Sequence, residues 1–114
     1  MADENKFLGK VFKNEILKVI ILMHLSRHEG YPYALLKAIQ NKKIWILQGV
    51  VKSDLYNTMN SLEKQGFIKG RTVMKGAVAR KNYLLTPKGR KIECASKRMM
   101  ARSFGEVIKM MREE

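Results

Sequence analysis

The chain has few of the residues on which several classes of protein depend. Its 114 residues include one cysteine, two prolines and one tryptophan. The single cysteine, Cys94, excludes an intrachain disulfide and an all-cysteine metal site. The longest unbroken apolar run, Val19 to Met23, is too short to cross a bilayer or to act as a signal sequence. A chain of this length forms one domain, and we expect it in the cytoplasm without a membrane partner.

Acidic residues are also scarce, since ten Asp and Glu oppose 23 Lys and Arg and the formal net charge is +13. The imbalance is greatest between Lys64 and Arg102, where Glu93 is the single acid. Such a bias favours a polyanionic partner. A solvated basic surface is the alternative interpretation, and composition alone leaves RNA or a membrane surface open. The basic residues of this segment are Lys64, Lys69, Arg71, Lys75, Arg80, Lys81, Lys88, Arg90, Lys91, Lys97, Arg98 and Arg102.

The sequence also lacks the motifs of catalysis. It has no paired carboxylates in a plausible cleft, no nucleophile motif and no phosphate-binding glycine loop. His24 and His28 have the helical spacing of metal ligands, but no carboxylate or cysteine motif completes a site around them. We therefore predict that the protein is not an enzyme, needs no cofactor and has no metal site.

What the chain does contain, from Val51 onward, is a short amphipathic helix pattern. Ser53 is the predicted N-cap, and Gly66 is predicted to end the helix. Leu55, Met59 and Leu62, with Tyr56 beside them, fall at helical spacing and form one apolar face. The other faces are left with polar side chains that can meet solvent or base edges, namely Asn57, Thr58, Asn60, Ser61 and Lys64.

Two extended runs and a second helix follow that pattern. Glycine and lysine at Lys75-Gly76 mark the bend between the two predicted strands. Thr86 and Pro87 then supply an N-cap and a first-turn proline for a long last helix. A helix followed by a hairpin rich in Lys and Arg is what a winged-helix DNA-binding protein needs. The apolar residues of the two strands are Phe67, Ile68, Val73, Val78, Tyr83, Leu84 and Leu85.

Two further helices are predicted upstream. Asn14 is expected to cap the first, which should end at Gly30, and Tyr31-Pro32-Tyr33 opens the second. Trp45, after the second helix, is interpreted as a core anchor, with an aromatic wall for a flat ligand as the alternative. The first helix has a broad apolar stripe that predicts burial on two sides, formed by Ile16, Leu17, Ile20, Ile21, Met23 and Leu25.

The last helix should run from about Pro87 to near the C-terminus, which is much longer than a small core needs. We therefore predict that part of it packs on a partner chain. An adaptable ligand surface made by its methionines is the alternative interpretation. Apolar residues, Ala95 among them, recur along this helix at steps of three and four. The predicted dimerisation residues are Ile92, Met99, Met100, Phe104, Val107, Ile108 and Met111.

Four motifs resemble the PadR family of transcriptional regulators over roughly residues 14 to 95. They are Tyr31-Pro32-Tyr33-Ala34-Leu35-Leu36, Ser53-Asp54-Leu55-Tyr56, Leu62-Glu63-Lys64-Gln65-Gly66-Phe67-Ile68 and Arg80-Lys81-Asn82-Tyr83-Leu84-Leu85-Thr86-Pro87-Lys88-Gly89. The resemblance implies a homodimer joined through the C-terminal and N-terminal helices, with two recognition helices presented to a roughly palindromic operator. The short C-terminal part resembles the compact subfamily with a single dimerisation helix.

The chain departs from the family pattern at several positions that bear on recognition. Pro32 and Asp54 stand where glycines are usual, Asn57 replaces a proline, and Asn60 and Ser61 stand where basic residues are frequent. Base preference therefore cannot be copied from relatives. Some members of the compact subfamily bind planar drugs between tryptophans of the last helix, where this chain has none. A small apolar or aromatic effector against Phe104 and the methionines is the alternative that the sequence leaves open.

The sequence thus predicts a mainly α fold with a small β-wing, in which a winged helix-turn-helix domain spans residues 1–86 and a dimerisation helix spans 87–114 as one compact unit. We predict a sequence-specific DNA-binding transcriptional regulator, a repressor that binds a palindromic operator in double-stranded DNA as a homodimer. A low-specificity architectural DNA-binding protein is the alternative, and an adaptor that binds protein through its winged helix is a second rival. The predicted DNA contacts are Lys52, Ser53, Tyr56, Asn57, Thr58, Asn60, Ser61, Lys64, Arg71, Lys75, Arg80 and Lys81.

Overall fold

Helices and one hairpin make up the described part of the chain, which in this computed structural model comprises residues 2–44 and 47–113, with side chains described from Phe12 onward. The elements in order are α1 (Ala2–Leu25), α2 (Pro32–Asn41), α3 (Lys52–Lys64), β1 (Ile68–Lys75), β2 (Val78–Leu85) and α4 (Pro87–Arg112). The two strands pair antiparallel. This mainly α fold with a small β-wing confirms the predicted fold class.

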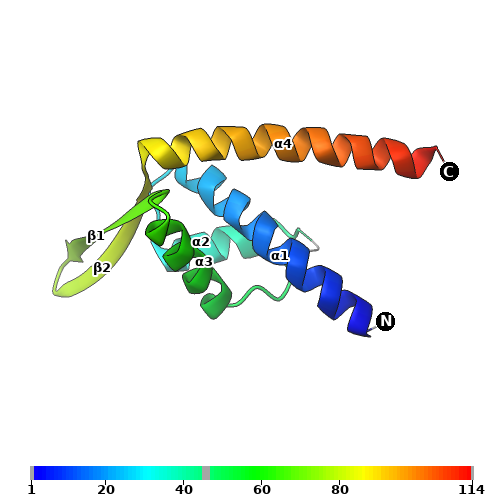
Figure 1. Ribbon diagram of the computed structural model, residues 1–114. Helices are drawn as coiled ribbons and strands as arrows, with labels where there is room; N and C mark the ends of the chain where they lie inside the picture. Colours follow the sequence, from blue (N-terminus) through cyan, green and yellow to red (C-terminus); the bar gives the residue numbers. More distant parts are fainter. Residues whose placement is uncertain (1, 45–46, 114) are drawn as a thin grey trace.

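The molecule is elongated because two elements project from the helical body. Its principal extents are 59 × 32 × 23 Å. Figure 1 shows the β1–β2 hairpin leaving the body on one side, while α4 runs along the top and continues past the end of its contact with α1. Helix α1 contacts α2, α3, α4 and β2, so it lies at the centre of the fold.

The core lies where α1, α2, α3 and the base of the hairpin meet. Leu17 and Ile21 of α1, Leu35 of α2 and Ile68 of β1 are buried there. The predicted apolar face of α3 is confirmed, because Leu55, Met59 and Leu62 are all at most 2% exposed. Burial of these aliphatic side chains supplies most of the hydrophobic stabilisation and fixes the orientation of α3.

The signals that end α3 and shape the hairpin act as the sequence predicts. Gly66 has a φ of 81°, the N–H of Phe67 donates to the carbonyl of Leu62 at 3.0 Å, and Gly66 donates to Glu63. This is a Schellman motif, in which glycine adopts the left-handed conformation without a Cβ clash. The hairpin turn is formed by Gly76 and Ala77, one residue later than predicted.

The N-terminus of α4 is fixed by the predicted pair of residues. The hydroxyl oxygen of Thr86 accepts a hydrogen bond from the N–H of Gly89 at 3.0 Å, and Pro87 occupies the first turn. The side chain satisfies one donor of the helix end, and proline loses nothing there because its position needs no N–H. The chain therefore passes from β2 directly into α4.

Both predicted ends of the first helix are wrong. Helix α1 begins at Ala2, so Asn14 lies exposed inside it and caps nothing. Asparagine on an exposed helix face costs only a fraction of a kcal/mol, about 0.7 at most, so it need not interrupt a helix. The helix ends at Leu25, and Gly30 instead pairs with Tyr83 of β2 through two hydrogen bonds of 3.0 and 2.9 Å. Gly30 thus extends the hairpin by a short third segment.

The predicted start of α3 is also wrong by two residues. Val51 is the N-cap and Ser53 lies within the first turn. Asp54 has the capping role, because its Oδ2 accepts a hydrogen bond from the N–H of Val51 at 3.0 Å. Trp45, whose role we predicted as a core anchor or an aromatic wall, lies outside the described residues.

Candidate nucleic-acid interface

One face of α3 is open to solvent and polar. Ser53, Tyr56, Asn57, Asn60 and Lys64 are exposed. Four of them, Ser53, Tyr56, Asn60 and Lys64, follow one another at steps of three, four and four residues, and Asn57 lies beside Tyr56. Such steps place side chains on one stripe of a helix, opposite the buried Leu55 face. The stripe carries amide and hydroxyl groups that can donate and accept, together with a terminal ammonium. It is therefore chemically suited to base edges and phosphates.

Charged side chains stabilise the start of α3. Lys13 of α1 lies 3.5 Å from the Asp54 carboxylate, and the ammonium of Lys52 lies 5.5 Å from the centre of the Tyr56 ring. A carboxylate in the first turn interacts favourably with the positive end of the helix dipole. The acid at position 54, which stands where the family pattern has glycine, therefore stabilises the helix N-terminus.

Two predicted contact residues of α3 are engaged within the fold. Thr58 is only 9% exposed, and its hydroxyl donates to the carbonyl of Asp54 at 2.8 Å. The expectation that Thr58 faces solvent is wrong, because a residue three positions after Leu55 lies on the buried side of the helix. Ser61 is half-buried, and the side-chain amide of Gln65 donates to its hydroxyl at 3.0 Å.

Of the four basic residues predicted on the wing, Arg71 is held by an acid from another element. Its Nη2 lies 3.1 and 3.0 Å from the two carboxylate oxygens of Glu29. The same carboxylate accepts a hydrogen bond of 2.6 Å from the side-chain amide of the buried Asn82. Glu29 thus joins both strands to the α1–α2 connection, so Arg71 acts first as an anchor of the wing.

Lys81 is held in a similar way by α3. Its ammonium lies 3.2 Å from Oε1 of Glu63, whose Oε2 accepts the N–H of Gly70 at 2.9 Å. The hydrogen bond from Gly70 and the nearby Lys81 lower the pKa of the Glu63 carboxyl, although burial opposes them. The hydrogen bond with Glu63 in turn raises the pKa of Lys81. This network ties α3 to the hairpin.

The lowered pKa of Glu63 gives a pH-dependent anchor. Because the folded state favours the ionised form, the stabilisation is present above the ordinary pKa of glutamate and is lost as the pH falls through the lowered value. We expect the NMR signal of the Gly70 amide to titrate with a midpoint below about pH 4.3. The accompanying loss of stability should stay below about 1 kcal/mol, because the pair is largely exposed.

Two variants test that anchor. Glu63→Gln should abolish the acid titration of the Gly70 amide, since the amide side chain has no proton to gain in this range. Glu15→Gln, which removes the acid of the exposed Lys18–Glu15 pair on α1, should leave it unchanged. A Gly70 signal that stays constant through the acid titration of the unmodified protein would contradict the assignment.

The other two basic residues predicted to contact DNA on the wing, Lys75 and Arg80, take part in none of the ion pairs found among the described side chains, and neither does the exposed Lys69 of β1. Lys75 lies next to the hairpin turn and is exposed. Arg80 is exposed on β2, with its guanidinium 5.8 Å from the centre of the Tyr31 ring. These two cations are therefore open to a phosphate, whereas Arg71 and Lys81 would first have to leave Glu29 and Glu63.

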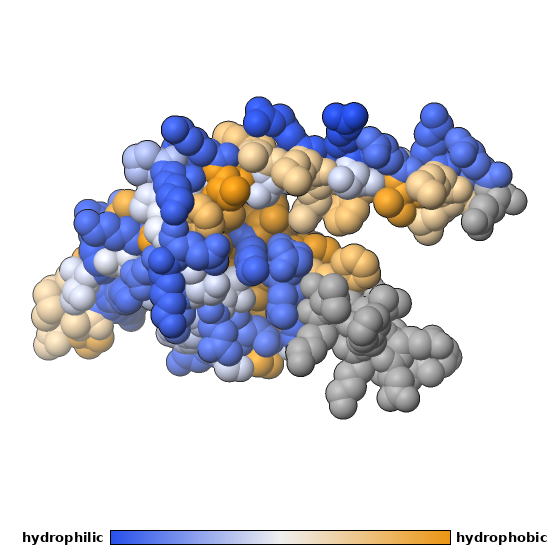
Figure 2. All heavy atoms as spheres, in the orientation of Figure 1, coloured by the Kyte–Doolittle hydropathy of each residue, from blue (hydrophilic) through white to orange (hydrophobic). Residues whose placement is uncertain are grey.

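The tip of the wing is apolar, which the sequence analysis did not identify. Met74 is 63% exposed and Val78 is 59% exposed. Figure 2 shows this tip as an apolar end on an otherwise hydrophilic hairpin. The sequence does show apolar residues on both sides of the Gly76 turn. An alternating pattern of apolar residues does not say, however, whether the apolar face of a strand is buried or exposed.

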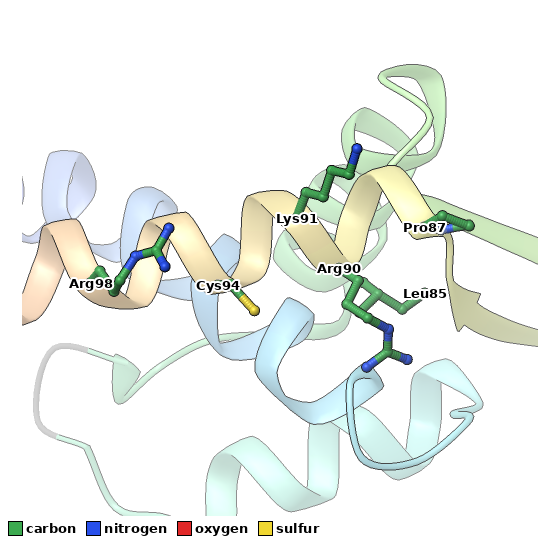
Figure 3. A pocket seen from close by; sticks show the side chains of 6 residues that line it. All are labelled: Leu85, Pro87, Arg90, Lys91, Cys94 and Arg98. Carbon is green, nitrogen blue, oxygen red and sulfur yellow. The ribbon is translucent and has the colours of Figure 1, made fainter.

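Half of the basic residues between Lys64 and Arg102 lie on α4 and not on α3 or the wing. Figure 3 shows Arg90, Lys91 and Arg98 extending from α4 around a cleft that also includes Cys94, a free thiol. Lys97 pairs with the buried Glu93 at 3.1 Å. The positive charge of this segment is thus divided between the predicted DNA-contacting elements and the last helix.

The second half of α4 presents an unpartnered apolar stripe. Figure 2 shows apolar side chains along the lower edge of this helix and hydrophilic ones along its upper edge. Ile92, of the predicted set, is half-buried and packs against the core of its own chain. The other predicted dimerisation residues face outward or are half-buried, namely Met99, Met100, Phe104, Val107, Ile108 and Met111.

Among the described residues, no group of three or more His, Cys, Asp and Glu side chains could hold a metal ion. In the same part of the chain no helix is long and apolar enough to cross a membrane.

Comparison with known families decides the broad class of the protein. The model of the transcriptional regulator PadR-like family matches residues 21–93, which include α2, α3, the wing and the start of α4. This chain belongs to that family. Its members are transcriptional regulators and not enzymes, so the prediction that this protein is not an enzyme is confirmed. A comparison with curated proteins found no match.

Solved structures of PadR-type regulators share this fold. A PadR family transcriptional regulator from Eggerthella lenta is 24% identical with a TM-score of 0.80, and the match covers 100% of this chain and 99% of that one. A PadR-like transcriptional regulator from Bacillus cereus is 22% identical with a TM-score of 0.76, covering 87% and 94%. Bacillus subtilis PadR in complex with operator DNA is 26% identical with a TM-score of 0.62, covering 70% and 46%.

Proposed function

We propose that this PadR-like regulator is a sequence-specific repressor that binds a roughly palindromic operator as a homodimer. The observation that carries the proposal is the exposed polar stripe of α3 beside a wing on which Lys75 and Arg80 form no ion pair with any described side chain. In this arrangement α3 enters the major groove, where base edges carry a distinct donor and acceptor pattern. The wing contacts the phosphate backbone, which positions the protein without reading sequence.

The homodimer is supported by the apolar stripe of α4. Phe104, Val107 and Ile108 are each 44–50% exposed in the second half of α4. Two copies of such a stripe would cover each other as in a coiled coil. Pairing them holds two α3 helices at a fixed separation, as a palindromic operator requires. Such a regulator would act in the cytoplasm, and a small apolar or aromatic effector would bind between the two copies of α4.

The two elements should contribute differently to DNA binding. Arg80→Ala or Lys75→Ala should weaken binding to all DNA and reduce the slope of log affinity against log salt by about one unit. Asn57→Ala or Asn60→Ala should cost about 1–3 kcal/mol of preference for the operator while largely sparing random DNA. Fluorescence anisotropy with both DNAs, at several salt concentrations, measures each quantity.

Matched controls exist for both kinds of variant. Asn14→Ala removes an exposed amide from α1, and Lys37→Ala removes an exposed cation from α2, both on elements other than α3 and the wing. Each should leave the operator preference unchanged. Equal losses on operator and random DNA for the Asn57 and Asn60 variants would contradict the proposed division between reading and positioning.

A competition experiment distinguishes the proposal from its two rivals. Bound fragments selected from the parent genome supply the operator, and random DNA is the competitor. A repressor should prefer the operator by about a thousandfold or more. An architectural protein should bind both DNAs alike, and an adaptor should bind neither.

A further inference from the structure

A cleft lies between the C-terminal ends of α1 and α2, and no residue of α3 or the wing lines it. Its volume is about 550 Å³. The floor is made by Ile20, Met23 and Ala38, which are half-buried. This volume falls within the range of about 300–1,000 Å³ that is typical of small-molecule sites.

The rim of the cleft is polar, and its charged groups have one sign. His24, Arg27 and His28 come from the end of α1 and the turn after it, while Asn41 and Lys42 come from the end of α2. None of the described residues that line the cleft is acidic. Arg27 and Lys42 take part in no ion pair between described side chains. Within the described part of the chain, the cleft therefore gathers cations that have no acidic partner.

The positive charge around the cleft affects its two histidines. Their ring centres lie 5.6 Å apart. Burial lowers the pKa of His24, and the neighbouring His28, Lys42 and Arg27 lower it further. The protonated ring is thus disfavoured by groups that face it from both helices. An anion in the cleft would reverse that effect.

The helix ends weaken this positive potential but do not cancel it. Each helix C-terminus carries roughly half a negative charge. Here the free carbonyls are partly satisfied, since Leu22, His24 and Ile39 accept backbone N–H groups from the residues that follow the helices. Arg27 and Lys42 contribute two permanent full charges, and the histidines add more when protonated. The full charges outweigh the partial ones.

We propose that this cleft binds a small organic phosphate monoester, with the phosphate among Arg27, Lys42 and the two histidines and an apolar body over Ile20 and Met23. A phosphate carries close to two negative charges at neutral pH and accepts hydrogen bonds on three oxygens. It can therefore accept from donors that converge from two helices. Because α2 packs on α3, a bound ligand would influence the placement of α3. An effect of the ligand on DNA binding through α3 rests on the proposed function, whereas ligand binding itself does not.

The test uses phenyl phosphate, with phenol and inorganic phosphate as controls, on the whole protein without DNA. At pH 6 we expect calorimetric binding of phenyl phosphate, with shifts in the NMR signals of both histidine rings. Phenol and inorganic phosphate should each bind at least about tenfold more weakly, because each lacks one half of the interaction. Saturation should raise the pKa of His24, because the bound phosphate favours the protonated ring.

Variants separate the cleft from general attraction to a basic protein. Arg27→Gln and Lys42→Gln should each weaken phenyl phosphate binding about tenfold. Lys43→Gln removes the same charge from the next residue, which does not line the cleft, and should change the affinity less than about twofold. Unshifted histidine signals at millimolar phenyl phosphate, or an equal loss in Lys43→Gln, would overturn the proposal. Inorganic phosphate binding as tightly as phenyl phosphate would overturn the organic part. Since no DNA is present, these failures are distinct from a failure of the proposed function.

Discussion

Replacing both Phe104 and Ile108 by Asp should convert the protein to monomers and lower its operator affinity by about a hundredfold or more. Both side chains lie on the exposed apolar stripe of α4, at 44% and 48% exposure. Burying unpaired carboxylates in a dimer seam costs several kcal/mol, roughly 3–5. Two separated subunits no longer hold their α3 helices at a fixed distance. Sedimentation measures the oligomeric state, and circular dichroism checks that the monomer stays folded.

A control variant with the same change in net charge isolates the seam. Arg102→Gln with Lys109→Gln also lowers the charge by two, but helical spacing places both residues opposite the stripe. It breaks the exposed Arg102–Glu106 pair, which contributes little. We expect this variant to remain dimeric and to lose only the general electrostatic part of DNA binding. If the Phe104→Asp, Ile108→Asp variant remained a folded dimer, the dimer interface would not be formed by this stripe of α4.

Gly89→Ala should destabilise the fold by about 3 kcal/mol, which corresponds to about 10 °C or more in Tm. Gly89 is buried in the first turns of α4, and a Cβ added there would overlap the carbonyl oxygen of Phe67. That carbonyl also accepts the N–H of Thr86 at 3.1 Å, so it cannot move without loss of the bond. The close approach joins α4 to the end of α3 and the start of β1. Thermal denaturation by circular dichroism measures the loss.

Gly105→Ala is the matched control on the same helix. Apart from its own helix backbone and chain neighbours, no atom of the described residues lies within 4 Å of a Cβ built at this position. Alanine is favoured over glycine inside an exposed helix, so this variant should be neutral or stabilising by up to about 1 kcal/mol. If Gly89→Ala proved as stable as Gly105→Ala, the packing of α4 against the Phe67 backbone would be wrong.

Local signals account for the parts of the fold that the sequence predicted well. The apolar spacing of Leu55, Met59 and Leu62 defines the buried face of α3, and Gly66 ends it. Thr86 and Pro87 begin α4. In each case the residues that carry the signal are neighbours on one element, so the periodicity of that element is sufficient. The buried position of Thr58 follows from the same spacing, three residues after Leu55, and could have been predicted.

Long-range contacts account for what the sequence missed. Arg71 and Glu29 are 42 residues apart in the sequence, and Lys81 and Glu63 are 18 apart. These pairs nevertheless decide which basic side chains of the wing are held in ion pairs within the fold. The bonds between Gly30 and Tyr83 likewise join distant segments. No local pattern reveals such partners, because they meet only after the helices have packed. The start of α1 was missed for a different reason, since Asn14 is compatible with both a cap and an exposed helix interior.

The most direct test of a dimer that reads two half-sites is to change the spacing between them in the selected operator. Inserting about five base pairs rotates one half-site by roughly half a turn relative to the other. Binding to the original and respaced operators is measured by anisotropy at one salt concentration. Affinity for the respaced operator should fall to near that for random DNA. Equal affinity for the two operators would contradict a repressor whose paired α4 helices fix the separation of its α3 helices.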